Sequence, residues 1–114
     1  MAELLRCVDR WYREVVLFED TWYDKIVVDH AWLVSYLNRL EGVLRNPDCV
    51  TFDADHPRGE NFYGASVLQP QHGGSLLKIC VRYRPADDER DFGIIVTAYP
   101  ALKIKRRETI RWRK

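Results

Sequence analysis

The sequence predicts an α+β domain in which an N-terminal strand and two helices pack on one face of a curved antiparallel β-sheet. Two helical patterns occupy the first half of the chain, β-branched runs fill the second half, and 114 residues are enough for one hydrophobic core. Apolar residues make up 46% and charged residues 31%, which is typical of a globular protein and excludes a wholly disordered one. We expect one domain over 1–114, with an N-terminal extension over 1–12 and a basic C-terminal tail over 103–114.

The first predicted elements are a strand and a short helix. Residues 13–18, Arg-Glu-Val-Val-Leu-Phe, are rich in the β-branched side chains that favour strands. Thr21 and Asp24 have the spacing of a capping box, which predicts a helix from Thr21 to about Val28.

A longer amphipathic helix is predicted over 32–44. Its apolar side chains recur at helical spacing, and they are Leu33, Tyr36, Leu37, Leu40 and Leu44. The helix ends at 46–48, Asn-Pro-Asp, because proline cannot continue the hydrogen-bond ladder. Short strands are predicted over 49–52 and 61–66, separated by a polar loop.

Two long strands, 76–83 and 92–99, are predicted to form a hairpin. An acidic loop over 85–91 joins them, and a Pro/Gly-containing turn over 69–75 precedes them. The sequence therefore ends in an antiparallel sheet.

Strand alternation divides the side chains of this hairpin between two faces. We expect Leu77, Ile79, Val81 and Tyr83 of the first strand, and Ile94, Val96 and Ala98 of the second, to face the core. The opposite face is then open to solvent and carries Lys78, Arg82, Thr97 and Tyr99.

The charge of the chain is unevenly distributed. Residues 103–114 contain seven basic residues and one acidic residue, a balance of +6, whereas the other 102 residues carry 11 basic and 16 acidic groups, a balance of −5. This asymmetry indicates either an edge that binds a polyanion or a solvated tail.

The cysteines, the histidines and the N-terminal residues argue against a disulfide-bonded, metal-binding, exported or membrane protein. Cys7, Cys49 and Cys80 are odd in number and lack C-x-x-C spacing, so we expect reduced thiols and no zinc ribbon. The three histidines are scattered, so we expect no metal site. The N-terminus does not resemble a signal peptide, and no apolar run approaches 18 residues, so we expect a cytoplasmic protein without membrane contact.

Several short segments occur in an order that one superfamily shares. They are residues 15–22, Lys25-Ile26 with His30 five residues after the lysine, Asn46-Pro47-Asp48-Cys49-Val50, Tyr63, the strands 77–81 and 96–99, and Lys103 or Lys105. Over most of residues 13–112 this order resembles the prophage-associated barnase, EndoU, colicin and RelE-like (BECR-fold) nucleases. The family usually has a histidine in place of Lys25 and a proline in place of Ala31.

The resemblance implies a metal-independent, toxin-like ribonuclease that needs no cofactor. Members mostly cleave RNA by attack of the 2′-hydroxyl on the adjacent phosphate. The implied partners are RNA and an antitoxin or immunity protein that neutralises the enzyme in its own cell.

This chemistry requires an acid, a base and groups that stabilise negative charge at the phosphate. His30 is the first acid or base candidate, because an imidazole titrates near neutral pH, and Lys25 is a weaker one. We expect Lys78 to hold the phosphate, and Thr97 and Tyr99 to donate hydrogen bonds or orient the ribose. The residues assigned to RNA or phosphate binding are Arg58, Tyr63, Arg82, Lys103 and Lys105.

Structural interpretations of the same residues remain open. His30 lies at a helix junction, where it can cap the preceding helix, and Lys25, Lys78 and Thr97 are ordinary choices for solvated positions. The alternative function is a non-catalytic module of the same fold that binds RNA or protein, and a purely structural prophage protein is a third. The enzyme hypothesis requires His30, Lys78 and Thr97 to converge on one phosphate.

Overall fold

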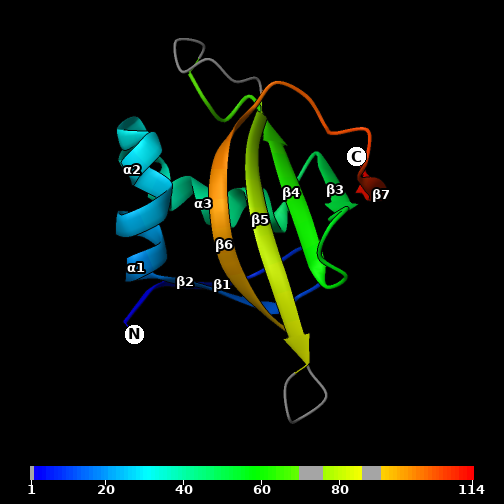
Figure 1. Ribbon diagram of the computed structural model, residues 1–114, viewed down its shortest axis with the longest axis horizontal. Helices are drawn as coiled ribbons and strands as arrows, with labels where there is room; N and C mark the ends of the chain where they lie inside the picture. The colour runs from blue at the N-terminus through cyan, green and yellow to red at the C-terminus, as the bar shows by residue number, and fades with distance from the viewer. Residues whose placement is uncertain (1, 70–75, 86–90) are drawn as a thin grey trace.

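A seven-stranded sheet forms the centre of the computed structural model, which describes residues 2–69, 76–85 and 91–114 (Figure 1). The strand order is β1-β2-β6-β5-β4-β3-β7. Paired strands are antiparallel except β2 and β6, which are parallel, so the α+β class is confirmed but the sheet is mixed. The strands are β1 (Glu3–Val8), β2 (Glu14–Phe18), β3 (Cys49–Phe52), β4 (Gly59–Ala65), β5 (Leu76–Pro85), β6 (Asp91–Ala101) and β7 (Thr109–Arg113).

The first helical stretch starts two residues before the predicted capping box. It comprises α1 (Glu19–Thr21), a π-helical turn η1 (Trp22–Ile26) and α2 (Val27–Asp29). Thr21 makes no side-chain capping hydrogen bond, so its predicted role is wrong. Glu19 and Asp20 instead place negative charge in the first turn, which suits the positive end of the helix dipole.

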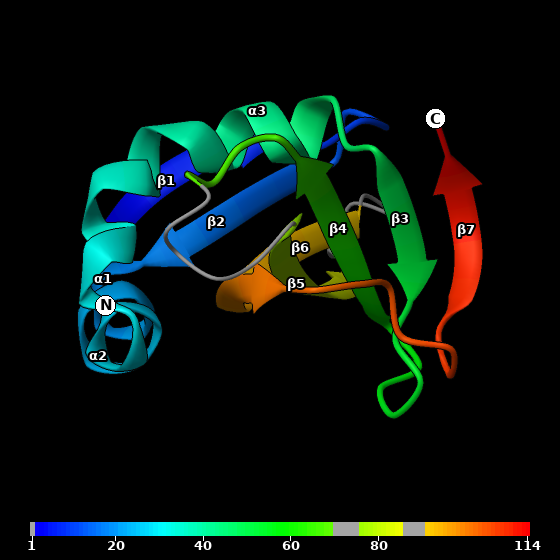
Figure 2. The same ribbon diagram turned by 90° about the horizontal axis from the view of Figure 1, so that it is seen from above.

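The second helical stretch comprises η2 (Ala31–Arg39), a 3₁₀ segment, and α3 (Leu40–Arg45). The predicted core positions Leu33, Tyr36, Leu40 and Leu44 are buried, while Leu37 is half-buried. Figure 2 shows α3 crossing one face of the sheet above β2. No helix among the described residues is long and apolar enough to span a membrane.

The segments that were expected to be an N-terminal extension and a basic tail each contain a strand of the sheet. Within the expected extension 1–12, β1 pairs with β2 and buries Cys7. Within the expected tail 103–114, β7 pairs with β3, and Trp112 packs against the core beneath the guanidinium of Arg10, 3.7 Å from its carbon to the ring centroid. Strand β7 was not predicted because the many charged residues of this segment leave no apolar alternation, and its contacts with the core come mainly from Trp112.

The predicted hairpin is confirmed as the antiparallel pair β5 and β6, but its alternation is interrupted. The register shifts between Cys80 and Val81, and Val96 is the extra residue of a β-bulge. Ile95 is therefore fully buried, whereas Ile94 and Val96, which were expected in the core, are half-buried. The predicted turn over 69–75 and loop over 85–91 lie, apart from their end residues, outside the described part of the chain.

Candidate functional site

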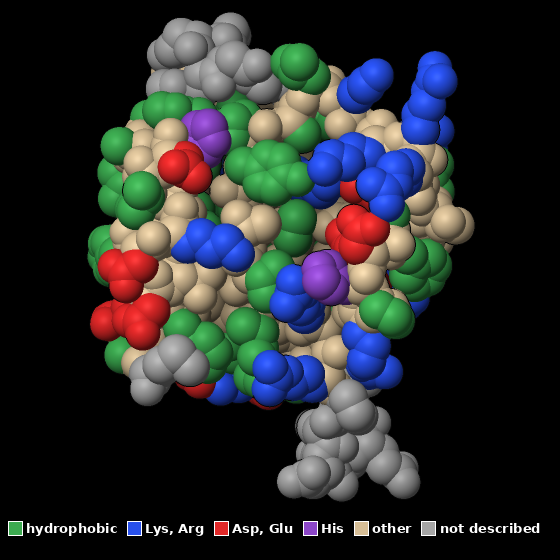
Figure 3. Space-filling view, viewed as in Figure 1, with side chains coloured by type: hydrophobic (Ala, Val, Ile, Leu, Met, Phe, Trp, Pro, Cys, Tyr) green, Lys and Arg blue, Asp and Glu red, His purple; other side chains and the backbone are tan. Residues whose placement is uncertain are grey.

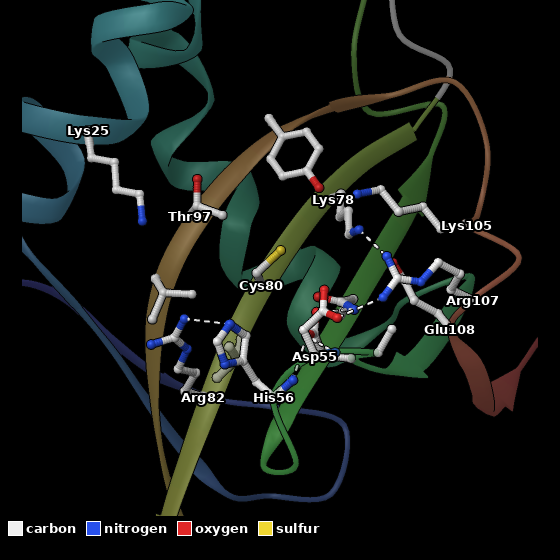
Figure 4. Close-up of a pocket in the computed structure, with 17 residues that line it drawn as sticks. Lys25, Asp55, His56, Lys78, Cys80, Arg82, Thr97, Lys105, Arg107 and Glu108 are labelled. Carbon is white, nitrogen blue, oxygen red and sulfur yellow. Dashed lines mark hydrogen bonds and ion pairs between the residues drawn. The ribbon is translucent and has the colours of Figure 1, made fainter.

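A pocket of about 230 Å³ opens on the sheet face opposite α3 (Figure 4). Strands β5 and β6 form its floor, the turn 53–59 and the loop 103–108 form two walls, and Lys25 reaches toward it from η1. The β-bulge at Val96 helps to place consecutive β6 residues against this space. Asn61 of β4 also lines it, so the fold brings side chains from six segments between Lys25 and Glu108 together at one pocket.

The pocket is cationic. Figure 3 shows lysine and arginine side chains gathered on this face of the molecule. Five cationic and three acidic side chains line the pocket: Lys25, Lys78, Arg82, Lys105 and Arg107, and Asp53, Asp55 and Glu108. Such a surplus of positive charge attracts anionic ligands.

A buried ion pair lies at the floor of the pocket. Lys78 Nζ donates to Glu108 Oε2 at 2.8 Å, and the Lys78 residue is only 2% exposed. Glu108 Oε1 accepts hydrogen bonds from Thr51 Oγ1 at 2.6 Å and Tyr63 Oη at 2.5 Å. Lys78 therefore does not lie on an open face as the alternation predicted, since the segment before β7 covers it.

Hydrogen bonding keeps both members of this pair charged. Burial opposes the charged ammonium, but hydrogen bonds with Glu108, Tyr99 and Tyr63 outweigh it and raise the pKa of Lys78 above its ordinary value. Burial likewise opposes the Glu108 carboxylate, yet its hydrogen bonds from Lys78, Thr51 and Tyr63 lower its pKa. Lys78 is consequently a fixed cation rather than a base.

Hydrogen bonds within the turn 53–59 define its conformation at the pocket wall. Asp53 Oδ2 accepts hydrogen bonds from the backbone N–H groups of Asp55 and His56, each at 3.0 Å, in the manner of an Asx turn. Gly59 N donates to the His56 carbonyl at 2.8 Å, and a Cβ at Gly59 would lie 2.8 Å from the Asp53 Cβ. The glycine therefore allows the close approach that fixes His56 beside the pocket.

The His56 imidazole is in contact with Arg82. Its Nε2 lies 2.9 Å from Arg82 Nη2. Because a guanidinium only donates, Nε2 is the acceptor and neutral His56 carries its proton on Nδ1. The arrangement places one acid–base group next to one anion-binding group, as Figure 4 shows.

Other reactive side chains in the pocket have restricted chemistry. Burial raises the pKa of the Cys80 thiol to about 11, so it is protonated at neutral pH and is a poor nucleophile. Asp55 is paired with Arg107 at 2.7 Å in an exposed ion pair. Among the described residues, no group of three or more His, Cys, Asp or Glu side chains is arranged to hold a metal ion.

The structure brings four of the five predicted catalytic residues to the pocket. Lys25, Lys78, Thr97 and Tyr99 line it. His30 does not: its half-buried ring makes an edge contact with Trp32, with ring centroids 5.7 Å apart. The expected convergence of His30 with Lys78 and Thr97 is therefore absent from this pocket.

The predicted RNA-binding residues are divided between four places. Arg82 and Lys105 line the pocket, while Tyr63 lies beneath its floor and donates to Glu108. Arg58 lines a separate hollow, where its Nε donates to the Tyr83 carbonyl at 2.7 Å. Lys103 is exposed and does not line the pocket.

Sequence reasoning missed the histidine and the carboxylates of this site. His56 was treated only as part of a polar loop, although the Asp53 to Gly59 spacing is the signal of a tight, ordered turn. Glu108 is the single acid in a basic run, which is a signal for a paired carboxylate.

Comparison of the chain with protein-family models, with curated proteins and with solved structures gave no match.

Proposed function

We propose that this chain is a metal-independent, toxin-like endoribonuclease that cleaves RNA by attack of a 2′-hydroxyl on the adjacent phosphate. The observation that carries the proposal is the contact of His56 with Arg82 at the mouth of a cationic pocket. The order of motifs that resembles the BECR-fold nucleases supports it, because Lys25, Thr97 and Tyr99 of that order line the same pocket.

The proposed phosphate site contains one buried cation at the pocket floor and several exposed cations at its mouth. Lys78 is fixed at the floor by Glu108, whereas Lys25 is exposed on η1 and Lys105 is exposed on the loop before β7. Arg82 presents a planar guanidinium suited to two phosphate oxygens. The exposed cations Lys25, Lys105 and Arg82 would stabilise the charge that accumulates at phosphorus in the transition state.

Proton transfers in the proposed reaction are assigned to groups at the mouth. When Arg82 turns to the phosphate, Nε2 of His56 is released to accept the proton of the attacking 2′-hydroxyl. The bond from phosphorus to the 5′-oxygen breaks, and that oxygen takes a proton from the Lys25 ammonium. The products carry a 2′,3′-cyclic phosphate and a 5′-hydroxyl, while Thr97 and Tyr99 orient the ribose.

The alternative is a non-catalytic module that binds RNA in the same pocket. It is favoured by the pairing of two of the pocket's carboxylates, since Glu108 is paired with Lys78 and Asp55 with Arg107. His56 is then the one imidazole at the pocket among the described residues. A protein with this role would retain RNA in a salt-sensitive manner without cutting it.

Cleavage of RNA in excess chelator tests the proposal. We expect His56→Ala to lose about 10²- to 10⁴-fold in rate, as removal of an acid–base group does. His30→Ala is the matched control and should keep full activity, because His30 does not line the pocket. Intact RNA at high protein concentration would remove the enzyme hypothesis, and salt-sensitive RNA retention in that experiment would support the binding module.

Expression in a bacterial host tests the toxin-like role in the cytoplasm, where RNA is the proposed substrate. Induction should arrest growth, and His56→Ala should relieve the arrest whereas His30→Ala should not. Normal growth at high levels of folded wild-type protein would contradict a toxin that requires an antitoxin or immunity protein.

A further inference from the structure

Strand β7 forms one edge of the sheet. It pairs with β3 on one side, and among the described residues no strand pairs with its other side. Figure 1 shows β7 at the periphery, beyond β3. An edge strand leaves alternating backbone N–H and C=O groups without sheet partners, which is a template for another extended chain.

The two edges of the sheet differ in charge. On β1, Arg6 is ion-paired with Glu3 and Glu14, so positive charge is compensated locally. Within 105–114 the one acid, Glu108, is buried against Lys78. Three cations of this segment are paired with acids of other segments, Arg107 with Asp55, Arg111 with Glu60 and Lys114 with Asp48, so the positive charge around β7 is compensated only in part. The cations on β7 and immediately beside it are Lys105, Arg106, Arg107, Arg111, Arg113 and Lys114.

One cation of this basic edge, residues 105–114, is fixed by contacts with other segments. Arg111 stacks on the Trp11 ring, with 4.2 Å from its guanidinium carbon to the centroid, and its Nε lies 3.3 Å from Glu60 Oε1. Ile110 is 46% exposed in the same strand. The edge therefore combines an ordered backbone, an exposed apolar side chain and flanking positive charge.

We propose that the outer edge of β7 pairs with an extended acidic segment of a partner protein. A peptide backbone satisfies both the donors and the acceptors of the edge, whereas RNA phosphates only accept hydrogen bonds and would leave the outer carbonyls unpaired. Acidic side chains on the segment complement the surrounding cations. A second copy paired through its own β7 would instead bring two basic edges together.

The position of β7 gives this pairing a regulatory consequence that rests on the proposed ribonuclease function. Thr109, its first residue, directly follows Glu108 at the pocket floor. A segment that continues beyond Thr109 reaches the loop carrying Lys105 and Arg107, which line the pocket. An acidic segment there would compete with RNA and neutralise the enzyme.

Synthetic peptides test the pairing separately from catalysis. The probe is an eight-residue peptide that alternates glutamate with valine, and its controls replace glutamate with lysine or carry N-methyl groups on alternate amides. We expect the acidic peptide to slow hydrogen exchange of β7 amides at least tenfold and to leave β1 unchanged. The lysine and N-methyl peptides should bind at least tenfold more weakly.

Two double variants that reverse charge, one at β7 and one on the helix, complete the experiment. Arg106→Glu with Arg113→Glu should weaken binding at least tenfold, while Arg39→Glu with Arg45→Glu makes the same change in charge on the exposed side of the helix and should not. Absence of binding, equal protection of β1, equal binding of the N-methyl peptide or dimerisation through β7 would overturn the proposal. β7 protection without any RNA cleavage would sustain the docking site and refute only the ribonuclease.

Discussion

Replacing Glu108 with alanine should be among the most destabilising single changes in this protein. The carboxylate accepts three hydrogen bonds, from Lys78, Thr51 and Tyr63, and its loss leaves the 2%-exposed Lys78 ammonium without its ion-pair partner. Removing one partner of a buried pair costs about 3–5 kcal/mol. A domain with roughly 5–15 kcal/mol of total stability would lose a large share of it.

Equilibrium unfolding in urea measures this loss. With a denaturant slope of about 2 kcal/mol/M, the midpoint should fall by about 2 M. Glu108→Gln should cost less, because an amide oxygen still accepts hydrogen bonds from Thr51 and Tyr63.

A double-mutant cycle separates the ion pair from simple loss of packing. Lys78→Met removes the charge that Glu108→Ala leaves unpaired, so the double variant should recover about 2 kcal/mol relative to the sum of the single changes. A midpoint shift below about 0.5 M for Glu108→Ala, or strict additivity in the cycle, would refute the claim that this pair anchors the pocket floor.

Three further predictions concern the ion pair, a closely packed glycine and the Cys80 thiol. Because the pKa of Glu108 is lowered on folding, its stabilisation should be present above its unfolded value of about 4.3 and be lost as pH falls through the folded value. The raised pKa of Lys78 gives a contribution that is present below about 10.4 and is lost as pH rises through the folded value. The difference in unfolding free energy between wild type and a variant with Lys78→Met and Glu108→Gln should therefore form a plateau between those limits, and a slope at pH 6–8 would contradict it. Gly93→Ala should cost about 1–3 kcal/mol by thermal or urea unfolding, since its Cβ would lie 2.8 Å from the Tyr83 ring, whereas Gly42→Ala, with nothing within 4 Å, should be neutral or stabilising. With its pKa raised to about 11, Cys80 should be alkylated at pH 8 about 100-fold more slowly in the folded than in the unfolded protein, and equal rates by mass spectrometry would show that folding does not raise the pKa of this thiol.

Local patterns in the sequence predicted most of the secondary structure. Leucine spacing located the second helical stretch, β-branched runs located β2, β3, β5 and β6, and the segment around the aromatic pair Phe62-Tyr63 located β4. The two edge strands were missed because both carry charges that obscure alternation, and β7 also depends on pairing with β3, which is distant in sequence. The parallel pairing of β2 with β6 also follows from topology rather than from either strand's composition.

The site was only partly predictable for the same reason. Lys78 and Thr97 follow from alternation on neighbouring strands, but the bulge at Val96 changes which β6 side chains reach the core. His30 was chosen for its residue type and motif position, whereas His56 reaches the pocket through a turn fixed by Asp53 and Gly59. The burial of Lys78 required knowledge that Glu108 folds back over the sheet.

The proposed cleavage of RNA through its 2′-hydroxyl, at the pocket containing His56 and Arg82, has a direct chemical test. The most direct measurement is mass spectrometry of the products from an RNA oligonucleotide, and from the same oligonucleotide in DNA form, incubated with protein in excess chelator. We expect RNA fragments ending in 2′,3′-cyclic phosphate, no cleavage of the DNA, loss of product with His56→Ala and retention with His30→Ala. Intact RNA, equal cleavage of DNA, or equal activity of the two histidine variants would contradict it.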